Sequence, residues 1–292
     1  MAQKKRFQSA RAAVLDALFA EGARAPRLLG VLNITPDSFS DGGKFLASDA
    51  AFAHALKLVE VGADALDLGA ESTRPGSRGT PAKLQKARLL PVLKRLRKAS
   101  ALHGIPLSID TQSAEVARAA LGEGADLLND VSAFRADAGL AKVAARAGCG
   151  VILMHMQGVP RSMQREPRYS DVIAELLRFF RERLDAACTA GIAPEKVLLD
   201  PGLGFGKTLA HNCEILRRLA DLTVIGRPLV VGASRKRFLG VLTGEEVPER
   251  RVQASVAVGL LALRNGARVL RVHDVAEHKL ALRVYHGIFP AP

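Results

Sequence analysis

Eight short apolar runs along the chain each end in or near a polar residue, and Gly-rich or helical sequence follows each of them. The polar residues that close the runs are Asn33, Glu71, Asp110, Asn129, His155, Asp200, Ser234 and His273. The chain advances 240 residues in seven steps from Asn33 to His273. A step of about 34 residues is what a strand, a crossover helix and two loops consume. The pattern therefore predicts eight consecutive βα units.

The apolar runs are rich in Val, Ile and Leu without polar alternation, which is typical of parallel strands buried on both faces. Between them lie apolar residues at helical spacing, such as Phe52, Leu56 and Val59. Several of these stretches end in a glycine shortly before the next run, as at Gly62 and Gly124, where a helix can close in the left-handed conformation. Eight such units predict a closed (β/α)8 barrel.

An open, doubly wound α/β sheet is the alternative fold. Such a sheet usually has fewer strands and carries a Gly-rich dinucleotide turn after the first one. Here the first run is followed by residues 35–40, which read Thr-Pro-Asp-Ser-Phe-Ser. The barrel is therefore favoured.

The length of 292 residues fits one barrel domain over residues 28–292 and an N-terminal extension over residues 1–27. The extension contains an amphipathic stretch with Leu15, Leu18 and Phe19, which predicts a helix packed on the barrel. An organelle-targeting peptide is the alternative for this segment. Asp16 and Glu21 argue against it, because targeting peptides are nearly free of acidic residues.

The amino-acid composition limits the classes of protein to which this chain can belong. No apolar run approaches the length of a membrane span, no secretory signal is present, and the three cysteines form no metal-spaced pair. We therefore expect a soluble, cytoplasmic protein with reduced thiols that does not act at a membrane. The net charge of +13 would suit a protein that binds nucleic acid. However, the arginines are scattered, tryptophan is absent and no nucleic-acid-binding module occurs in the sequence. A basic field that attracts small anionic substrates explains the charge without a nucleic-acid partner.

Active sites of barrels lie at the carboxyl ends of the strands, where all eight polar residues fall. A single Asp or Asn after a strand is often a turn or cap residue, but eight around one rim indicate a site. The loops 35–45 and 71–81 are long and combine charged residues with glycines, which is typical of lids. Residues 201–208 resemble a phosphate-binding P-loop, yet Pro201 stands where that motif needs its first glycine.

Two strand ends suggest anion binding. Ser234 stands at the expected start of a helix, with the charges of Arg235 and Lys236 beside it, and a simple helix cap is the alternative. At the last run, Arg271 and His273 alternate to the same side and suit a polyphosphate. His155 and His211 are further candidates for acid–base chemistry, with a structural cap as the alternative for His155.

Seven segments carry a further pattern in a fixed order: residues 33–43, 69–76, 108–111, 129–130, 200–207, 234–236 and 271–274. In their order and spacing around one barrel they resemble dihydropteroate synthase, over roughly residues 28–287. The one departure is Ala70, where the family commonly has a second glycine. Residues 1–27 have no reliable counterpart.

The resemblance implies that a 6-hydroxymethyl-7,8-dihydropterin diphosphate condenses with p-aminobenzoate to give dihydropteroate and pyrophosphate in folate biosynthesis. The implied pterin-binding residues are Asp110, Asn129, Met154, Asp200, Phe205, Lys236 and Arg271. The implied p-aminobenzoate-binding residues are Phe39, Thr73, Arg74, Pro75 and Ser234. The implied pyrophosphate-binding residues are Asn33, Arg271 and His273, with Mg²⁺ at Asn33. The implied catalytic residues are Asn33, Asp37, Lys236, Arg271 and His273.

These roles are chemically consistent, because the donor edge of a pterin needs buried acceptors and a departing pyrophosphate needs cations. The resemblance also implies a homodimer and a sulfonamide target. Two alternatives remain at this stage. One is a pterin-dependent methyltransferase, which shares the pterin acceptors but does not need residues 73–75 or the Ser-Arg-Lys site. The other is a binding paralogue without turnover.

Overall fold

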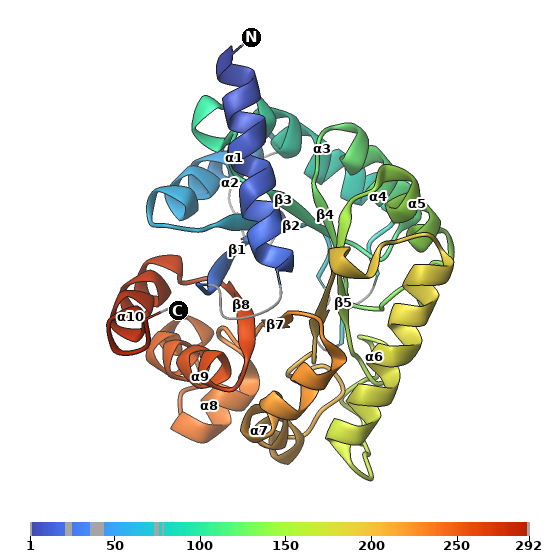
Figure 1. The fold of residues 1–292 in the computed structure, drawn as a ribbon, viewed down its shortest axis with the longest axis vertical. Coiled ribbons are helices and arrows are strands. Elements are labelled where there is room, and N and C mark those ends of the chain that lie inside the picture. The colour runs from blue at the N-terminus through green and yellow to red at the C-terminus, as the bar shows by residue number, and fades with distance from the viewer. Residues whose placement is uncertain (1, 21–24, 36–43, 73–75, 78, 291–292) are drawn as a thin grey trace.

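The structure is a computed structural model that describes residues 2–20, 25–35, 44–72, 76–77 and 79–290. Eight parallel strands pair in chain order and close into a barrel, with the intervening helices around it, as Figure 1 shows. This arrangement confirms the predicted (β/α)8 fold. No helix in the part of the chain that is described is long and apolar enough to cross a membrane.

The strands are β1 (Arg27–Asn33), β2 (Ala65–Gly69), β3 (Leu107–Asp110), β4 (Leu127–Asp130), β5 (Gly150–Met154), β6 (Val197–Asp200), β7 (Leu229–Val231) and β8 (Ala267–Val272). The α-helices are α1 (Ala2–Phe19), α2 (Lys44–Glu60), α3 (Ala82–Lys98), α4 (Ala114–Gly122), α5 (Gly139–Ala147), α6 (Val172–Thr189), α7 (Leu209–Arg217), α8 (Arg237–Thr243), α9 (Val252–Arg264) and α10 (Val275–Ile288). The glycines predicted to end helices do so with positive φ, as Gly148 does with φ +61° after α5.

Strand register gathers the polar strand ends at one mouth. Gly69 of β2 lies between Asn33 of β1 and Asp110 of β3, and Asp110 in turn faces Asn129 of β4. Because side chains alternate along a strand, residues two apart point to the same face. The interior of the barrel is therefore filled in layers, apolar toward the amino ends and polar toward the carboxyl ends.

Helix α1 covers the amino-terminal end of the barrel, where it crosses in front of the strands in Figure 1. Leu15, Leu18 and Phe19 pack on an apolar layer made by residues near the amino-terminal ends of the strands. That layer consists of Leu29, Ala65, Leu127, Ile152, Leu198, Val230 and Val269. At Gly150 even a Cβ atom would lie 2.1 Å from the Phe19 ring, so glycine is required for this contact. The N-terminal extension thus completes the hydrophobic interior.

Replacing Leu18 with alanine should lower the free energy of unfolding by about 2–5 kcal/mol, because a buried leucine leaves a cavity when truncated. Leu18 is only 2% exposed and lies at the end of the barrel opposite the polar mouth, so KM values should not change. Urea denaturation and steady-state kinetics measure the two effects. Leu84→Ala, at a position 39% exposed on α3, is the matched control. Equal stability of the two variants would contradict the packing of α1.

Candidate active site

The carboxyl ends of the strands enclose a narrow cavity. All seven residues predicted to bind the pterin lie in its wall, together with Val131 and Gly232. Those seven are Asp110, Asn129, Met154, Asp200, Phe205, Lys236 and Arg271. They come from six different strands or the loops after them, so only closure of the barrel brings them together.

The guanidinium of Arg271 is held between two buried carboxylates. Its Nε donates to Asp67 Oδ2 at 2.6 Å, and its Nη2 donates to Asp110 Oδ2 at 2.9 Å. Asn129 Nδ2 also donates to Asp67 Oδ2, at 2.9 Å. Asp67 is fully buried in the middle of β2, and the sequence reasoning missed it because only strand ends were considered. Asp67 lies two residues from both Ala65 and Gly69 and so points to the same interior face of β2. This alternation is the sequence signal by which Asp67 could have been predicted.

In this cavity, burial and nearby charges shift the pKa values of the ionisable side chains in opposite directions. Burial raises the pKa of Asp110 to about 7, although Arg271 opposes the shift. Burial also raises the pKa of Asp200, against the nearby charge of Lys236. In the reverse sense, burial lowers the pKa of Lys236 to about 8, and Asp200 opposes this. Perturbed acids and bases in one cavity are typical of functional sites.

One wall of the cavity is apolar and polarisable. Phe205 packs with Val131 and Met154, and the ammonium of Lys236 lies 4.6 Å from the centre of the Phe205 ring. Met156 and Met163 complete this cluster, and neither was predicted from the sequence. Methionine adapts to the faces of flat rings, so the wall suits an aromatic heterocycle.

The glycines of the segment after β6 allow it to lie very close to the backbone of the loop after β5. A Cβ at Gly202 would lie 1.9 Å from the carbonyl oxygen of His155, and one at Gly206 would lie 2.5 Å from that of Gln157. Both glycines also have positive φ, +67° and +60°. The segment is therefore packed against the β5–α6 loop.

A second part of the rim is formed by Asn33, Ser234 and His273. The backbone N–H of His273 donates to Ser234 Oγ at 3.2 Å, and His273 Nδ1 lies 3.1 Å from the same oxygen. A Cβ at Gly69 would lie 3.7 Å from Asn33 Oδ1 and 3.9 Å from Asp110 Oδ2. Glycine at this position therefore keeps the space between the amide and the carboxylate open.

The prediction for the segment after β7 was partly wrong. Helix α8 begins at Arg237 and has seven residues, so Ser234 precedes the helix and does not start it. Arg235 has φ +60° and forms two hydrogen bonds with Asp274, which pairs its charge with that carboxylate. A local turn that links the ends of β7 and β8 replaced the expected helix start. Of the two predicted cations, only Lys236 lines the cavity.

His155 and His211, the two additional candidates for acid–base chemistry, both make contacts that support the fold. His155 Nδ1 lies 2.9 Å from the Nζ of Lys207, and burial together with that charge lowers the pKa of His155 to about 2. His155 is therefore neutral near pH 7. It cannot act as a general base there, because its imidazole does not take up a proton in that pH range. His211 accepts from the backbone N–H of Thr208 and completes a capping box at the start of α7.

Five predicted site residues lie outside the described residues. They are Asp37, Phe39, Thr73, Arg74 and Pro75. Of the residues predicted for p-aminobenzoate, the structure describes Ser234.

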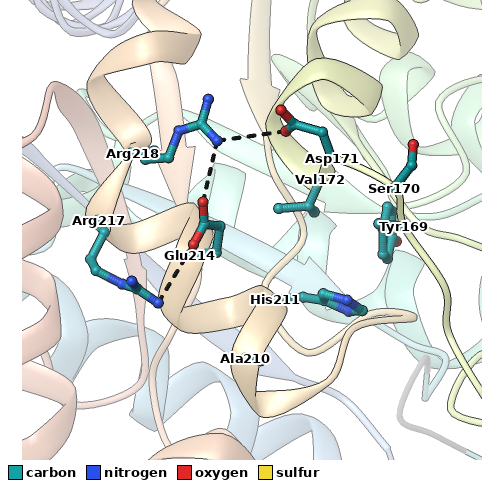
Figure 2. A pocket seen from close by; sticks show the side chains of 9 residues that line it. All are labelled: Tyr169, Ser170, Asp171, Val172, Ala210, His211, Glu214, Arg217 and Arg218. Carbon is teal, nitrogen blue, oxygen red and sulfur yellow. Dashed lines mark hydrogen bonds and ion pairs between the residues drawn. The ribbon is translucent and has the colours of Figure 1, made fainter.

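A wider groove lies outside the barrel mouth, between the start of α6 and α7, and Figure 2 shows its lining. Arg218 lies 3.2 Å from Glu214 and 3.7 Å from Asp171, and Arg217 lies 3.5 Å from Glu214. The charges that line this groove therefore neutralise one another. Of the candidates from the sequence it contains only His211, which caps α7, so the barrel mouth remains the candidate active site.

The closed barrel and its cavity of buried acceptors, cations and an apolar wall define a (β/α)8-barrel enzyme for a flat heterocycle, and the pterin binding enzyme family matches residues 29–273. The chain is 42% identical over 273 residues to dihydropteroate synthase of Neisseria meningitidis serogroup C, covering 92% of this chain and 95% of that one. It is 41% identical over 278 residues to the Escherichia coli K12 enzyme, covering 94% and 97%. The chain belongs to the dihydropteroate synthase family and is a transferase.

Solved structures agree with this assignment. Dihydropteroate synthase of Xanthomonas albilineans with 4-aminobenzoic acid is 46% identical, with a TM-score of 0.85, and the match covers 92% of this chain and 95% of that one. A structure of the same protein in complex with 7,8-dihydropteroate matches at 43% identity with a TM-score of 0.82, covering 93% and 97%. The barrel and its connections are thus shared with enzymes of the family.

Proposed function

We propose that this protein condenses 6-hydroxymethyl-7,8-dihydropterin diphosphate with p-aminobenzoate, releasing pyrophosphate and 7,8-dihydropteroate for folate biosynthesis. The observation that carries the proposal is the single cavity that unites all seven residues expected to bind a pterin. Relatives that are solved with 4-aminobenzoic acid and with 7,8-dihydropteroate support the choice of substrates.

The pterin enters the cavity with its N–H edge toward the buried acceptors. Asp200, Asn129 and Asp110 offer carboxylate and amide oxygens, and a charge-assisted hydrogen bond of this kind is worth about 1.5–3 kcal/mol. Met154 and Phe205 pack on the ring faces. Lys236 binds the carbonyl side of the ring, and Arg271 stacks on it.

In the reaction the amine nitrogen bonds to the methylene carbon, the bond from that carbon to the diphosphate oxygen breaks, and the amine loses one proton. Negative charge grows on the departing pyrophosphate and positive charge on the methylene. Arg271 and His273 stabilise the leaving group, while the carboxylates around the pterin, with Asp37, stabilise the cation. Catalysis is therefore mainly electrostatic.

The p-aminobenzoate site adjoins the pyrophosphate site. Phe39, Thr73, Arg74 and Pro75 bind the arylamine, and Ser234 binds its carboxylate. The contact between Ser234 and His273 supports this adjacency, because it joins one residue of each proposed subsite. Such proximity positions the amine for attack. A sulfonamide drug is bound in the Yersinia pestis relative, and we propose that sulfonamides occupy this same subsite here.

Mg²⁺ is the proposed cofactor, with Asn33 as its protein ligand. Among the described residues no group of three or more His, Cys, Asp or Glu side chains could hold a metal ion by itself. The space beside Gly69, flanked by Asn33 Oδ1 and the Asp110 carboxylate, fits an ion that arrives with the diphosphate, because Mg²⁺ commonly combines few protein oxygens with substrate phosphates. When bound, the ion neutralises charge on the leaving group.

We also propose a homodimer that works in the cytoplasm. Helices α8, α9 and α10 contact one another in sequence and expose apolar side chains that are more than half accessible. These are Val241, Leu242, Leu261, Leu280, Val284 and Ile288. Large exposed apolar patches mark interfaces, and a second copy of the chain is the occupant expected from closed two-fold symmetry. A monomer in analytical ultracentrifugation at micromolar concentration would contradict this.

A pyrophosphate-release assay tests the activity. With Mg²⁺ and the pterin diphosphate, release should depend on added p-aminobenzoate, and 7,8-dihydropteroate should form in equal amount. Release that is independent of the amine would contradict the condensation, and no release with tight pterin binding would indicate a binding paralogue. Methyl transfer from a methylated pterin to a corrinoid protein would indicate the methyltransferase alternative.

Pterin affinity should rise as the pH increases through about 7. The pKa of Asp110 is raised to about 7, so below this pH the carboxyl is protonated and offers one acceptor fewer to the pterin. The dissociation constant of a pterin without its diphosphate, measured by fluorescence from pH 5.5 to 8.5, should fall toward a plateau above pH 7. Asp110→Asn should weaken binding and remove this pH dependence. An unchanged profile in that variant would exclude Asp110 as the titrating group.

A further inference from the structure

Lys207 is a buried lysine that the proposed reaction does not use. It ends the Gly-rich segment after β6 and is only 3% exposed. Its Nζ lies 2.9 Å from His155 Nδ1, 3.0 Å from the carbonyl oxygen of Phe205 and 3.4 Å from that of His155. No carboxylate of a described residue forms an ion pair with it.

These three contacts satisfy the lysine completely. With Lys207 Nζ as the donor, His155 Nδ1 is the acceptor and the neutral imidazole carries its proton on Nε2. Burying a charge without such partners is very costly. Burial lowers the pKa of Lys207 well below its usual value and the charge of Asp200 opposes this shift, while the three contacts hold the side-chain nitrogen in place.

The acceptors belong to the two loops that wall the proposed pterin cavity. His155 directly follows Met154 at the end of β5, and Phe205 lies in the loop after β6. Both Met154 and Phe205 line the cavity. Lys207 itself is not among the residues that line the cavity, so it joins the two walls without being part of them.

Other bonds between these loops lie nearer the solvent. The hydroxyl of Tyr169 donates to the Gly206 carbonyl at 2.7 Å, and Gln164 Nε2 donates to the Gly204 carbonyl at 2.5 Å. The Tyr169 bond is partly buried and the Gln164 bond is exposed, so water competes for these groups more than for the buried contact between Lys207 and His155. Lys207 is the best-protected link between the two loops in the part of the chain that is described.

We propose that Lys207 is a positioning residue for pterin binding, whose buried amino group fastens the loop after β5 to the loop after β6 and so fixes the spacing of Met154 and Phe205. This inference rests on the proposed function, because it concerns the pterin cavity. It gives the lysine of the Gly-rich segment a role other than phosphate binding.

Lys207→Met tests the proposal, because methionine fills a similar volume but donates no hydrogen bond. We expect the dissociation constant of 6-hydroxymethylpterin to rise at least about tenfold, which corresponds to about 1.4 kcal/mol. The KM for p-aminobenzoate and kcat at saturating pterin diphosphate should stay within about twofold of wild type, because the lysine touches neither substrate. A residue that only supports the fold would lower stability without this selective loss.

Lys196→Met is the matched control. Lys196 also donates to a backbone carbonyl, that of Gly148 at 2.6 Å, but it lies at the amino-terminal end of the barrel. Pterin affinity should be unchanged in this variant. Unchanged pterin affinity in Lys207→Met, or equal losses for both substrates, would overturn the proposal.

If Lys207→Met does not fold, Tyr169→Phe tests whether the link between the loops after β5 and β6 supports pterin binding. It removes one bond between the same two loops and retains the ring, so pterin affinity should fall about twofold to fivefold. An unchanged affinity in this folded variant would then overturn the proposal. Amine-dependent pyrophosphate release by the wild-type protein separates this outcome from a failure of the proposed function.

Discussion

Replacing Arg271 with methionine should abolish turnover and lower the free energy of unfolding by about 3–5 kcal/mol. The guanidinium is the shared partner of Asp67 and Asp110, so its removal leaves two carboxylates without their cation in the barrel interior. The variant also loses the cation that is proposed to stabilise the departing pyrophosphate. Urea denaturation measures the first effect, and the pyrophosphate-release assay measures the second.

A double variant separates stability from catalysis. Arg271→Met combined with Asp67→Asn removes one of the stranded charges and should regain part of the lost stability without regaining turnover. Arg264→Met, at the end of α9 and outside the cavity, is the matched control and should behave like wild type. Substantial turnover by a folded Arg271→Met variant would contradict the role given to Arg271.

The Asp200→Asn variant should lose pterin binding, with a dissociation constant raised at least about 100-fold, or about 2.7 kcal/mol. Asp200 is buried, and one of its oxygens accepts from the Gly202 backbone N–H at 2.7 Å. An amide places a donor where the pterin also presents a donor, so two buried groups remain unpaired. Isothermal titration with a pterin measures the loss.

Asp221→Asn is the control for this substitution. Asp221 is exposed and pairs with Arg218 on the outer surface, so its amide variant should bind the pterin normally. Wild-type-like affinity in Asp200→Asn would exclude Asp200 as the main acceptor of the pterin edge.

The fold was predictable because each unit repeats the same local signals. The apolar runs, the helical spacing between them and the closing glycines gave eight βα units, which the structure confirms. The seven residues expected around a pterin received that role from the resemblance to the family. Asp110, Asn129 and Asp200 among them also stood out as polar strand ends, which parallel register places together whatever their separation in the chain.

The remainder of the site depends on tertiary contacts. Asp67 was missed because it lies mid-strand, where only its interior orientation distinguishes it. Met163 joins the apolar wall from a loop whose path no local pattern indicates. Ser234 was expected to start a helix, but the pairing of Arg235 with Asp274 fixes a turn there instead. In each case the deciding partner is distant in sequence.

The packing of α1 has a consequence for biosynthesis. This helix precedes the barrel in the chain and leaves the ribosome before it, yet the layer that it covers includes Val230 of β7 and Val269 of β8. At about 5–20 residues per second, the apolar side chains of α1 wait tens of seconds for their final partners. Because α1 is made before the strands that it covers, it completes its docking only after β7 and β8 have been made.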